Sequence, residues 1–109
     1  MDLSDKIKKD IKENKIMLYM KGTKEMPMCG FSSTVVNILN LYKVDYKTAN
    51  VLEDANIRYE LSKFSNWPTI PQLYIKKEFI GGCDIVKEMY ETGELLEFFN
   101  SKGVENKPS

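Results

Sequence analysis

The sequence predicts a single α/β domain with one mixed four-stranded sheet and helices on both of its faces. The chain has 109 residues, the usual length of one domain, and 42% of them are apolar, which suffices for a modest core. Segments with the periodicity of amphipathic helices alternate along the chain with short apolar runs typical of strands. This alternation is what favours the α/β class.

The first half of the chain predicts a leading helix and then a strand–helix–strand unit. Apolar residues recur every fourth position over residues 3–13 and predict a helix. The continuous apolar run IMLYM (16–20) is typical of a strand buried on both faces. An apolar stripe over 31–42 predicts the next helix, and DYKTA (45–49) a second strand. A strand–helix–strand connection of this length makes the two strands parallel.

The second half begins with another helix and a hairpin. Apolar residues spaced by four and then three positions over 57–64 predict the helix. PQLYI (71–75) and KEFIG (77–81) predict two antiparallel strands. The turn between them, around Lys76-Lys77, lacks the Asn-Gly pair usual where φ must be positive. We therefore expect this turn to be strained or longer.

The C-terminal part predicts two more helices. Asp84 is expected to cap a helix that ends at Gly93, and a short helix follows over 95–99. The whole chain forms one domain, with residues 1–14 as its leading helix and the polar residues 101–109 as a flexible tail. The order of these elements is that of a thioredoxin-like architecture.

Charge and composition exclude several classes of function. Sixteen basic and sixteen acidic residues balance, which argues against binding to nucleic acid or an anionic membrane. The chain has no histidine, which removes Cys–His and Ser–His–Asp catalysis and the commonest zinc ligand. Two cysteines form no disulfide framework of the secreted kind. No apolar run is long enough to span a membrane, and the N-terminus does not resemble a signal or transit peptide. We expect a cytoplasmic location, or a mitochondrion or other organelle if a presequence has been removed.

Cys29 is the first candidate functional residue. It follows a loop with glycine and proline and stands just before the helix that starts near Phe31. The N–H groups and positive dipole at a helix start favour thiolate, and Lys21 could add a positive charge. Ser32 stands where a second cysteine would complete a C-x-x-C pair. Cys29 could therefore form a mixed disulfide with a small thiol, pair with Cys83, or bind a metal with outside ligands. An inert buried cysteine is the alternative.

Two further stretches are candidates for a binding site. In NWPTIPQLYI (66–75), a cis bond between Ile70 and Pro71 would turn the Ile70 backbone groups toward a ligand, whereas a trans bond is the ordinary case. In GGCD (81–84), the glycines permit close backbone approach and the following helix offers amides to an anion. By itself this second signal is weak, and Cys83 is equally well explained as a small buried residue.

Taken together, four stretches resemble the monothiol glutaredoxins of the CGFS type. The resemblance covers about residues 15–99. It implies that the protein binds glutathione and a [2Fe–2S] cluster at a homodimer interface. Two CGFS cysteines and two glutathione thiolates would supply the four sulfur ligands. It also implies cluster transfer to apo iron–sulfur acceptor proteins, a part in iron homeostasis, and BolA-like proteins as partners. The four stretches are MKGT (20–23), CGFS (29–32), NWPTIPQLYI (66–75) and GGCDI (81–85).

The resemblance also implies roles for individual residues. Cys29 would be the cluster ligand and the redox-active thiol. Seven residues would surround glutathione: two at its glycine carboxylate, three at its cysteinyl part, with the proline cis, and two at its γ-glutamyl end. Lys21 and Arg58 are the two at the glycine carboxylate. Thr69, Ile70 and Pro71 are the three at the cysteinyl part, and Cys83 and Asp84 are the two at the γ-glutamyl end.

Two other functions stay open at this point. The first is a glutathione-dependent thiol–disulfide oxidoreductase that removes glutathione from mixed disulfides with Cys29 as the nucleophile. In the resembled family, the longer loop KGTKEMP (21–27) accompanies weak activity of this kind on generic substrates. The second is a non-catalytic adaptor that binds a regulatory partner through the same face.

Overall fold

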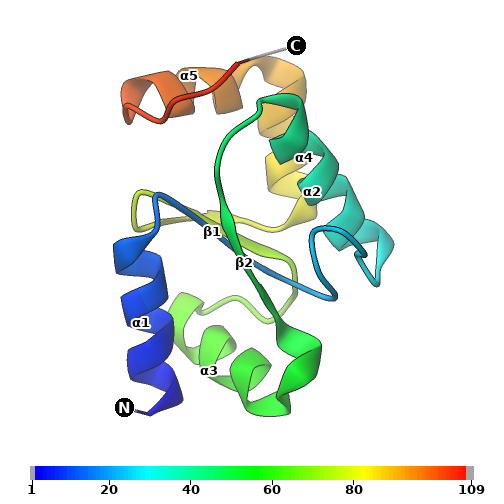
Figure 1. The fold of residues 1–109 in the computed structure, drawn as a ribbon, viewed down its shortest axis with the longest axis vertical. Coiled ribbons are helices and arrows are strands. Elements are labelled where there is room, and N and C mark those ends of the chain that lie inside the picture. The colour runs from blue at the N-terminus through cyan, green and yellow to red at the C-terminus, as the bar shows by residue number, and fades with distance from the viewer. Residues whose placement is uncertain (1, 108–109) are drawn as a thin grey trace.

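The computed structural model describes residues 2–107 and consists of a four-stranded sheet between two layers of helices (Figure 1). The strand order is β2-β1-β3-β4. The central strand β1 (Ile16–Met20) is parallel to β2 (Lys47–Asn50) and antiparallel to β3 (Gln72–Ile75). Strand β3 is in turn antiparallel to β4 (Glu78–Gly81). The predicted mixed four-stranded sheet, with its parallel first pair and its hairpin, is confirmed.

The helices divide between the two faces of the sheet. Helices α1 (Leu3–Glu13) and α3 (Ala55–Ser65) pack together on one face. Helices α2 (Gly30–Leu41) and α4 (Cys83–Thr92) pack together on the opposite face, and α5 (Glu94–Ser101) packs against α4. A single 3-10 turn, η1 (Val51–Glu53), follows β2.

Strand β1 is buried along its whole length because its side chains alternate between two cores. Ile16, Leu18 and Met20 belong to the core formed with α2, α4 and α5. Met17 and Tyr19 belong to the core formed with α1 and α3. The uninterrupted apolar run in the sequence therefore reflects a strand covered on both faces.

Two local predictions are refined by the structure. The hairpin turn at Lys76-Lys77 keeps only these two residues, and both have positive φ, 49° and 72°. The expected strain is confirmed, since this region is unfavourable for a side chain such as lysine. The expected cap at Asp84 is wrong: α4 starts at Cys83 with Gly82 as its N-cap, and Asp84 lies inside the first turn.

The second strand and the C-terminal tail also lie differently from the sequence pattern. Strand β2 starts at Lys47 and not at residue 45, and the Tyr46 carbonyl accepts a hydrogen bond from the Lys24 ammonium. In the tail, Val104 is buried, and the Lys107 N–H donates to the Tyr42 carbonyl. Residues 108–109 lie outside the described part of the chain. Between residues 2 and 107, no helix combines the length and apolar character needed to cross a bilayer.

Candidate functional site

Cys29 is the N-cap residue of α2, at the end of the loop that leaves β1. Its Sγ accepts a hydrogen bond from the Ser32 backbone N–H at 3.3 Å, and the Ser32 hydroxyl lies 3.3 Å from the same sulfur. That hydroxyl also accepts a hydrogen bond from the Lys21 N–H at 3.1 Å. Ser32 is fully buried. The serine that replaces a second cysteine therefore connects the thiol to the end of β1.

The loop before Cys29 is closed by its own backbone. The Met28 N–H donates to the Lys21 carbonyl at 2.8 Å. Gly22 has a φ of 92°, and a Cβ at this position would lie 2.5 Å from the Met26 carbonyl oxygen, so glycine is required for the turn. The side chains of Met26 and Met28 in this loop are exposed, by 69% and 61%, and Met28 directly precedes Cys29.

The surroundings of Cys29 favour its thiolate. Burial alone would raise its pKa, but three hydrogen-bond donors and one charge act in the other direction and lower the pKa below its usual value. The donors are the Ser32 hydroxyl and the N–H groups of Ser32 and Phe31, and the charge is the Lys21 ammonium. Because the thiolate is both the nucleophile and the metal-binding form, Cys29 is suited to either chemistry.

A cavity of about 210 Å³ lies between the segment 67–71 and the start of α4. The Ile70–Pro71 peptide bond is cis, as the resemblance implied. Within residues 2–107, the hydrogen bonds between backbone groups leave the Ile70 N–H and C=O without a partner. Five residues predicted for glutathione line this cavity: Thr69, Ile70, Pro71, Cys83 and Asp84.

A buried glutamine supports the wall of this cavity. Gln72 is fully buried, and its Nε2 donates to the Trp67 carbonyl at 2.9 Å and to the Thr69 carbonyl at 3.3 Å. Its Oε1 accepts a hydrogen bond from the Tyr74 hydroxyl at 2.9 Å. The amide nitrogen of Gln72 thereby fixes the segment that carries the cis bond, and its amide oxygen is satisfied by Tyr74 of β3.

Cys83 borders the same cavity but has the opposite electrostatic surroundings. Burial and the neighbouring Asp84 carboxylate raise its pKa, and they outweigh a hydrogen bond from Thr34 and the charge of Lys87. Both cysteines are free and partly buried. A raised pKa leaves less thiolate, so we expect Cys83 to be the less reactive thiol of the two.

The other predicted residues, Cys29, Lys21 and Arg58, do not line the cavity themselves. Phe31, in the first turn of α2, lines the cavity; Cys29 stands two residues before it and is near enough to Cys83, another lining residue, to act on the pKa of that thiol. Lys21 is near enough to Cys29 to influence its pKa. Arg58 is exposed on α3 and is not among the residues that line the cavity. Its role at a glycine carboxylate stays a prediction.

Sequence reasoning missed three apolar residues that line the cavity. Phe31 is 64% exposed, Trp67 38% and Ile85 38%. All three lie within or beside the quoted motifs, and only Trp67 carried a signal, as an aromatic residue in a segment rich in turn formers. Phe31 was instead assigned to the apolar stripe of its helix.

The fold and the site together define a protein of the thioredoxin-like class with one activated thiol at the start of a helix. The family model described as Glutaredoxin matches residues 16–80, and the chain belongs to the glutaredoxin family. Its single CGFS thiol and its relatives place it among the monothiol members.

Two relatives and one solved structure illustrate the similarity. The chain is 62% identical over 89 residues to "Probable monothiol glutaredoxin 2" of Rickettsia typhi, covering 82% of this chain and 80% of the relative. It is 47% identical over 95 residues to "Glutaredoxin-related protein 5, mitochondrial" of Danio rerio, covering 86% and 61%. The solution structure of a monomeric truncated mutant of Trypanosoma brucei 1-C-Grx1 matches with a TM-score of 0.90 at 35% identity, covering 100% of this chain and 99% of that one.

Proposed function

We propose that the protein binds glutathione in the cavity beside Cys29 and, together with it, carries a [2Fe–2S] cluster shared by two copies of the chain. The observation that carries this proposal is one thiol with a lowered pKa at the border of a cavity, and no second thiol of that kind near it. Within residues 2–107, no three side chains of His, Cys, Asp or Glu gather into a metal site. A [2Fe–2S] cluster takes four thiolates, so one from each chain and one from each glutathione complete the set.

The cavity offers the chemistry that a peptide-like thiol needs. The free backbone N–H and C=O of Ile70 suit the cysteinyl part of glutathione. The exposed amides at the start of α4 suit its γ-glutamyl carboxylate, and the Asp84 carboxylate suits its ammonium. Lys21 and Arg58 are proposed partners of the glycine carboxylate.

The surface around the thiol supports a shared cluster. Met28 and Phe31, close to Cys29 in the chain, expose large apolar side chains, and Trp67 exposes another at the cavity that Phe31 lines. Exposed apolar side chains of this size fit a protein–protein contact. Because half of the cluster ligands come from a diffusible tripeptide, the cluster is suited to transfer to apo iron–sulfur proteins. We assign the same face to BolA-like partners, and we propose work in the cytoplasm, with a mitochondrial or other organellar location as the alternative.

The test is anaerobic reconstitution with iron, sulfide and glutathione, followed by the visible spectrum, iron and sulfide content and native mass. The wild type and the matched control Cys83→Ser are expected to form red-brown dimers with one [2Fe–2S] cluster per two chains. Cys29→Ser is expected to stay a colourless monomer, and removal of glutathione is expected to bleach the wild type. Full cluster content in Cys29→Ser would falsify the proposal.

A second activity is favoured by the lowered pKa of Cys29 alone. The thiolate would attack the glutathione sulfur of a mixed disulfide and release the target thiolate. A second glutathione would then attack the Cys29–glutathione disulfide, giving glutathione disulfide and restoring the thiolate. A coupled assay with glutathione reductase measures this turnover, which we expect to be weak. Turnover as high in Cys29→Ser as in the wild type would exclude Cys29 as the nucleophile.

A further inference from the structure

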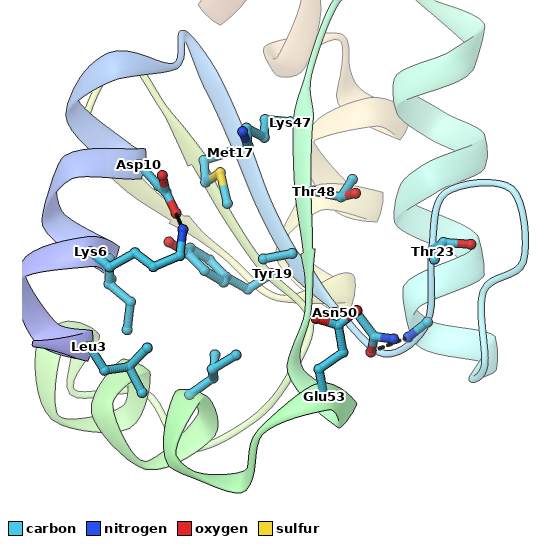
Figure 2. Close-up of a pocket in the computed structure, with 14 residues that line it drawn as sticks. Leu3, Lys6, Asp10, Met17, Tyr19, Thr23, Lys47, Thr48, Asn50 and Glu53 are labelled. Atoms are coloured by element: carbon cyan, nitrogen blue, oxygen red, sulfur yellow. Dashed lines mark hydrogen bonds and ion pairs between the residues drawn. The ribbon is translucent and has the colours of Figure 1, made fainter.

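A second cavity, of about 290 Å³, lies along β2 at the edge of the sheet, against α1 and α3 (Figure 2). All four residues of β2, Lys47–Asn50, line it. Successive side chains of a strand point to opposite faces of the sheet. Four consecutive lining residues therefore indicate that the cavity borders the backbone edge of β2 and not one face alone. It contains none of the residues assigned to glutathione.

The edge of β2 has free hydrogen-bonding groups. Strand β2 is outermost in the sheet and pairs with β1 alone. In a parallel pair, every second residue directs its N–H and C=O toward the neighbouring strand, so two residues of β2 direct theirs outward. In the part of the chain that the structure describes, no backbone hydrogen bond from outside the sheet reaches residues 47–50. Such an edge can accept an additional strand.

The cavity wall beside this edge is apolar, with one unsatisfied hydroxyl. Ile7, Met17 and Ile57 supply aliphatic surface. Tyr19 also lines the cavity, and its hydroxyl is buried without a hydrogen-bond partner among the described residues (Figure 2). An apolar side chain that entered the cavity would find aliphatic contacts. The Tyr19 hydroxyl could then be satisfied by a peptide group of the ligand, or by a water held with it.

The charges along the cavity are arranged in a definite order. Lys6 and Asp10 neutralise each other at 3.1 Å. Lys47 and Glu53 also line the cavity, and neither forms an ion pair with another described residue. Lys47 starts β2, whereas Glu53 ends the turn that follows it, and Figure 2 shows them at opposite ends of the cavity. The site therefore presents a cation at one end and an anion at the other.

We propose that this edge binds a short extended peptide as an added strand, antiparallel to β2. Its carboxylate would face Lys47, its ammonium would face Glu53, and a central apolar side chain would occupy the cavity. The direction follows from the charges, because β2 runs from Lys47 toward Glu53. A strand advances about 3.3 Å per residue, so a tripeptide extends over roughly 10 Å and matches most of the four residues of β2.

The probe for the test is the free tripeptide Val-Leu-Val, titrated into the reduced full-length chain labelled with nitrogen-15. We expect saturable shifts of the amide signals of residues 47–50. Three matched peptides separate the contacts: the acetylated form lacks the ammonium, the amidated form lacks the carboxylate, and Val-Ser-Val lacks the apolar centre. Each should bind about threefold more weakly or worse.

A pair of charge variants tests the orientation. Lys47→Glu is expected to weaken binding of the free tripeptide by about fivefold and to remove the difference between the free and the amidated forms. Lys12→Glu makes the same charge change on α1 outside the cavity and should have no such effect. Lys47 is exposed, so the variant is expected to fold normally. The proposal is overturned by the absence of saturable shifts, by shifts at Trp67 and Gly82 in place of β2, or by equal binding of all four peptides.

Discussion

Cys29 and Cys83 occupy almost equivalent places in the fold but have opposite acidities. Each stands at the start of a helix on the same side of the sheet, and each is partly buried. The pKa of Cys29 is lowered and that of Cys83 is raised. The positive end of a helix is common to both thiols, so it cannot by itself explain the difference.

The difference between the two pKa values has two causes: the positions of the cysteines in their helices differ by one residue, and the side chains near each sulfur differ. Cys29 is the N-cap, so its sulfur accepts the Ser32 N–H; Cys83 is the first residue inside its helix, where Gly82 is the N-cap. Lys21 stands near Cys29, whereas the charge with the largest effect on Cys83 is that of Asp84. In this chain, the thiol with the lowered pKa is the one whose sulfur takes the capping position and has a lysine nearby.

The largest expected effect is in the reactivity of the two thiols. At pH 7, iodoacetamide should alkylate Cys29 about tenfold faster than Cys83, because a lower pKa leaves more thiolate. The measurement compares two single-thiol variants, Cys83→Ser and Cys29→Ser, by mass spectrometry over time. Equal rates would show that the contrast between the two helix starts has no chemical consequence.

The next effect comes from removing the hydroxyl that contacts the sulfur. Ser32→Ala should raise the pKa of Cys29 and slow its alkylation at pH 7 by about threefold. It should also reduce the free energy of unfolding by about 1–2 kcal/mol, since the Lys21 N–H loses its buried partner. Ser33→Ala is the matched control, since no hydrogen bond of its hydroxyl is found between residues 2 and 107. An unchanged alkylation rate in Ser32→Ala would assign the low pKa to the backbone alone.

Charge changes near one thiol should shift the pKa of that thiol more than the pKa of the other. Lys21→Gln should raise the pKa of Cys29 and slow its alkylation by about twofold, with a smaller effect on Cys83, whose pKa is also raised by the charge of Cys29. Asp84→Asn should lower the pKa of Cys83 and speed its alkylation by a similar factor. The double variant would bring the two rates closer together. A larger rate change at the other thiol than at the neighbouring one in either single variant would contradict this assignment.

The smallest effect is the pH dependence of stability. A lowered folded pKa means that the contribution of Cys29 to stability is present above the unfolded thiol pKa and is lost as the pH falls through the folded pKa. A raised folded pKa means that the contribution of Cys83 is present below the unfolded pKa and is lost as the pH rises through the folded pKa. Urea unfolding of the wild type, Cys29→Ser and Cys83→Ser at several pH values under reducing conditions should therefore give differences of opposite slope.

Much of the fold followed from side-chain periodicity, since the apolar spacing in a helix or strand directly reflects which face is buried. The five-residue run of β1 and the helix after Cys29 are clear cases. The start of α4 was less predictable. Asp84 is a good capping residue by type, but the preceding Gly82 approaches the Pro71 carbonyl so closely that a Cβ would lie 3.2 Å from it. That contact joins segments distant in sequence, so the capping preference of a single residue could not predict it.

In the candidate site, too, some residues could be predicted from the sequence and others could not. Cys29 and the cavity residues of the segment 69–71 could be proposed from motifs, because the chemistry of a thiol and of an X–Pro bond is local. The lining by Phe31 and Ile85 could not, since their exposure depends on how α2 and α4 meet. The network that Gln72 makes beneath the loop was equally invisible in the sequence.

Oxidation of the two exposed methionines that precede Cys29 would last longer than oxidation of the thiol itself. Oxidants that reach the Cys29 sulfur also reach the thioethers of Met26 and Met28, which are 69% and 61% exposed. An oxidised thiol that has formed a disulfide is restored by another thiol, whereas a methionine sulfoxide needs its own reductase. After oxidation, the thiol would be restored first, while Met26 and Met28 would remain as polar sulfoxides. Cys29 would then be reduced again, while the oxidised methionines still altered the surface that the protein offers to partners.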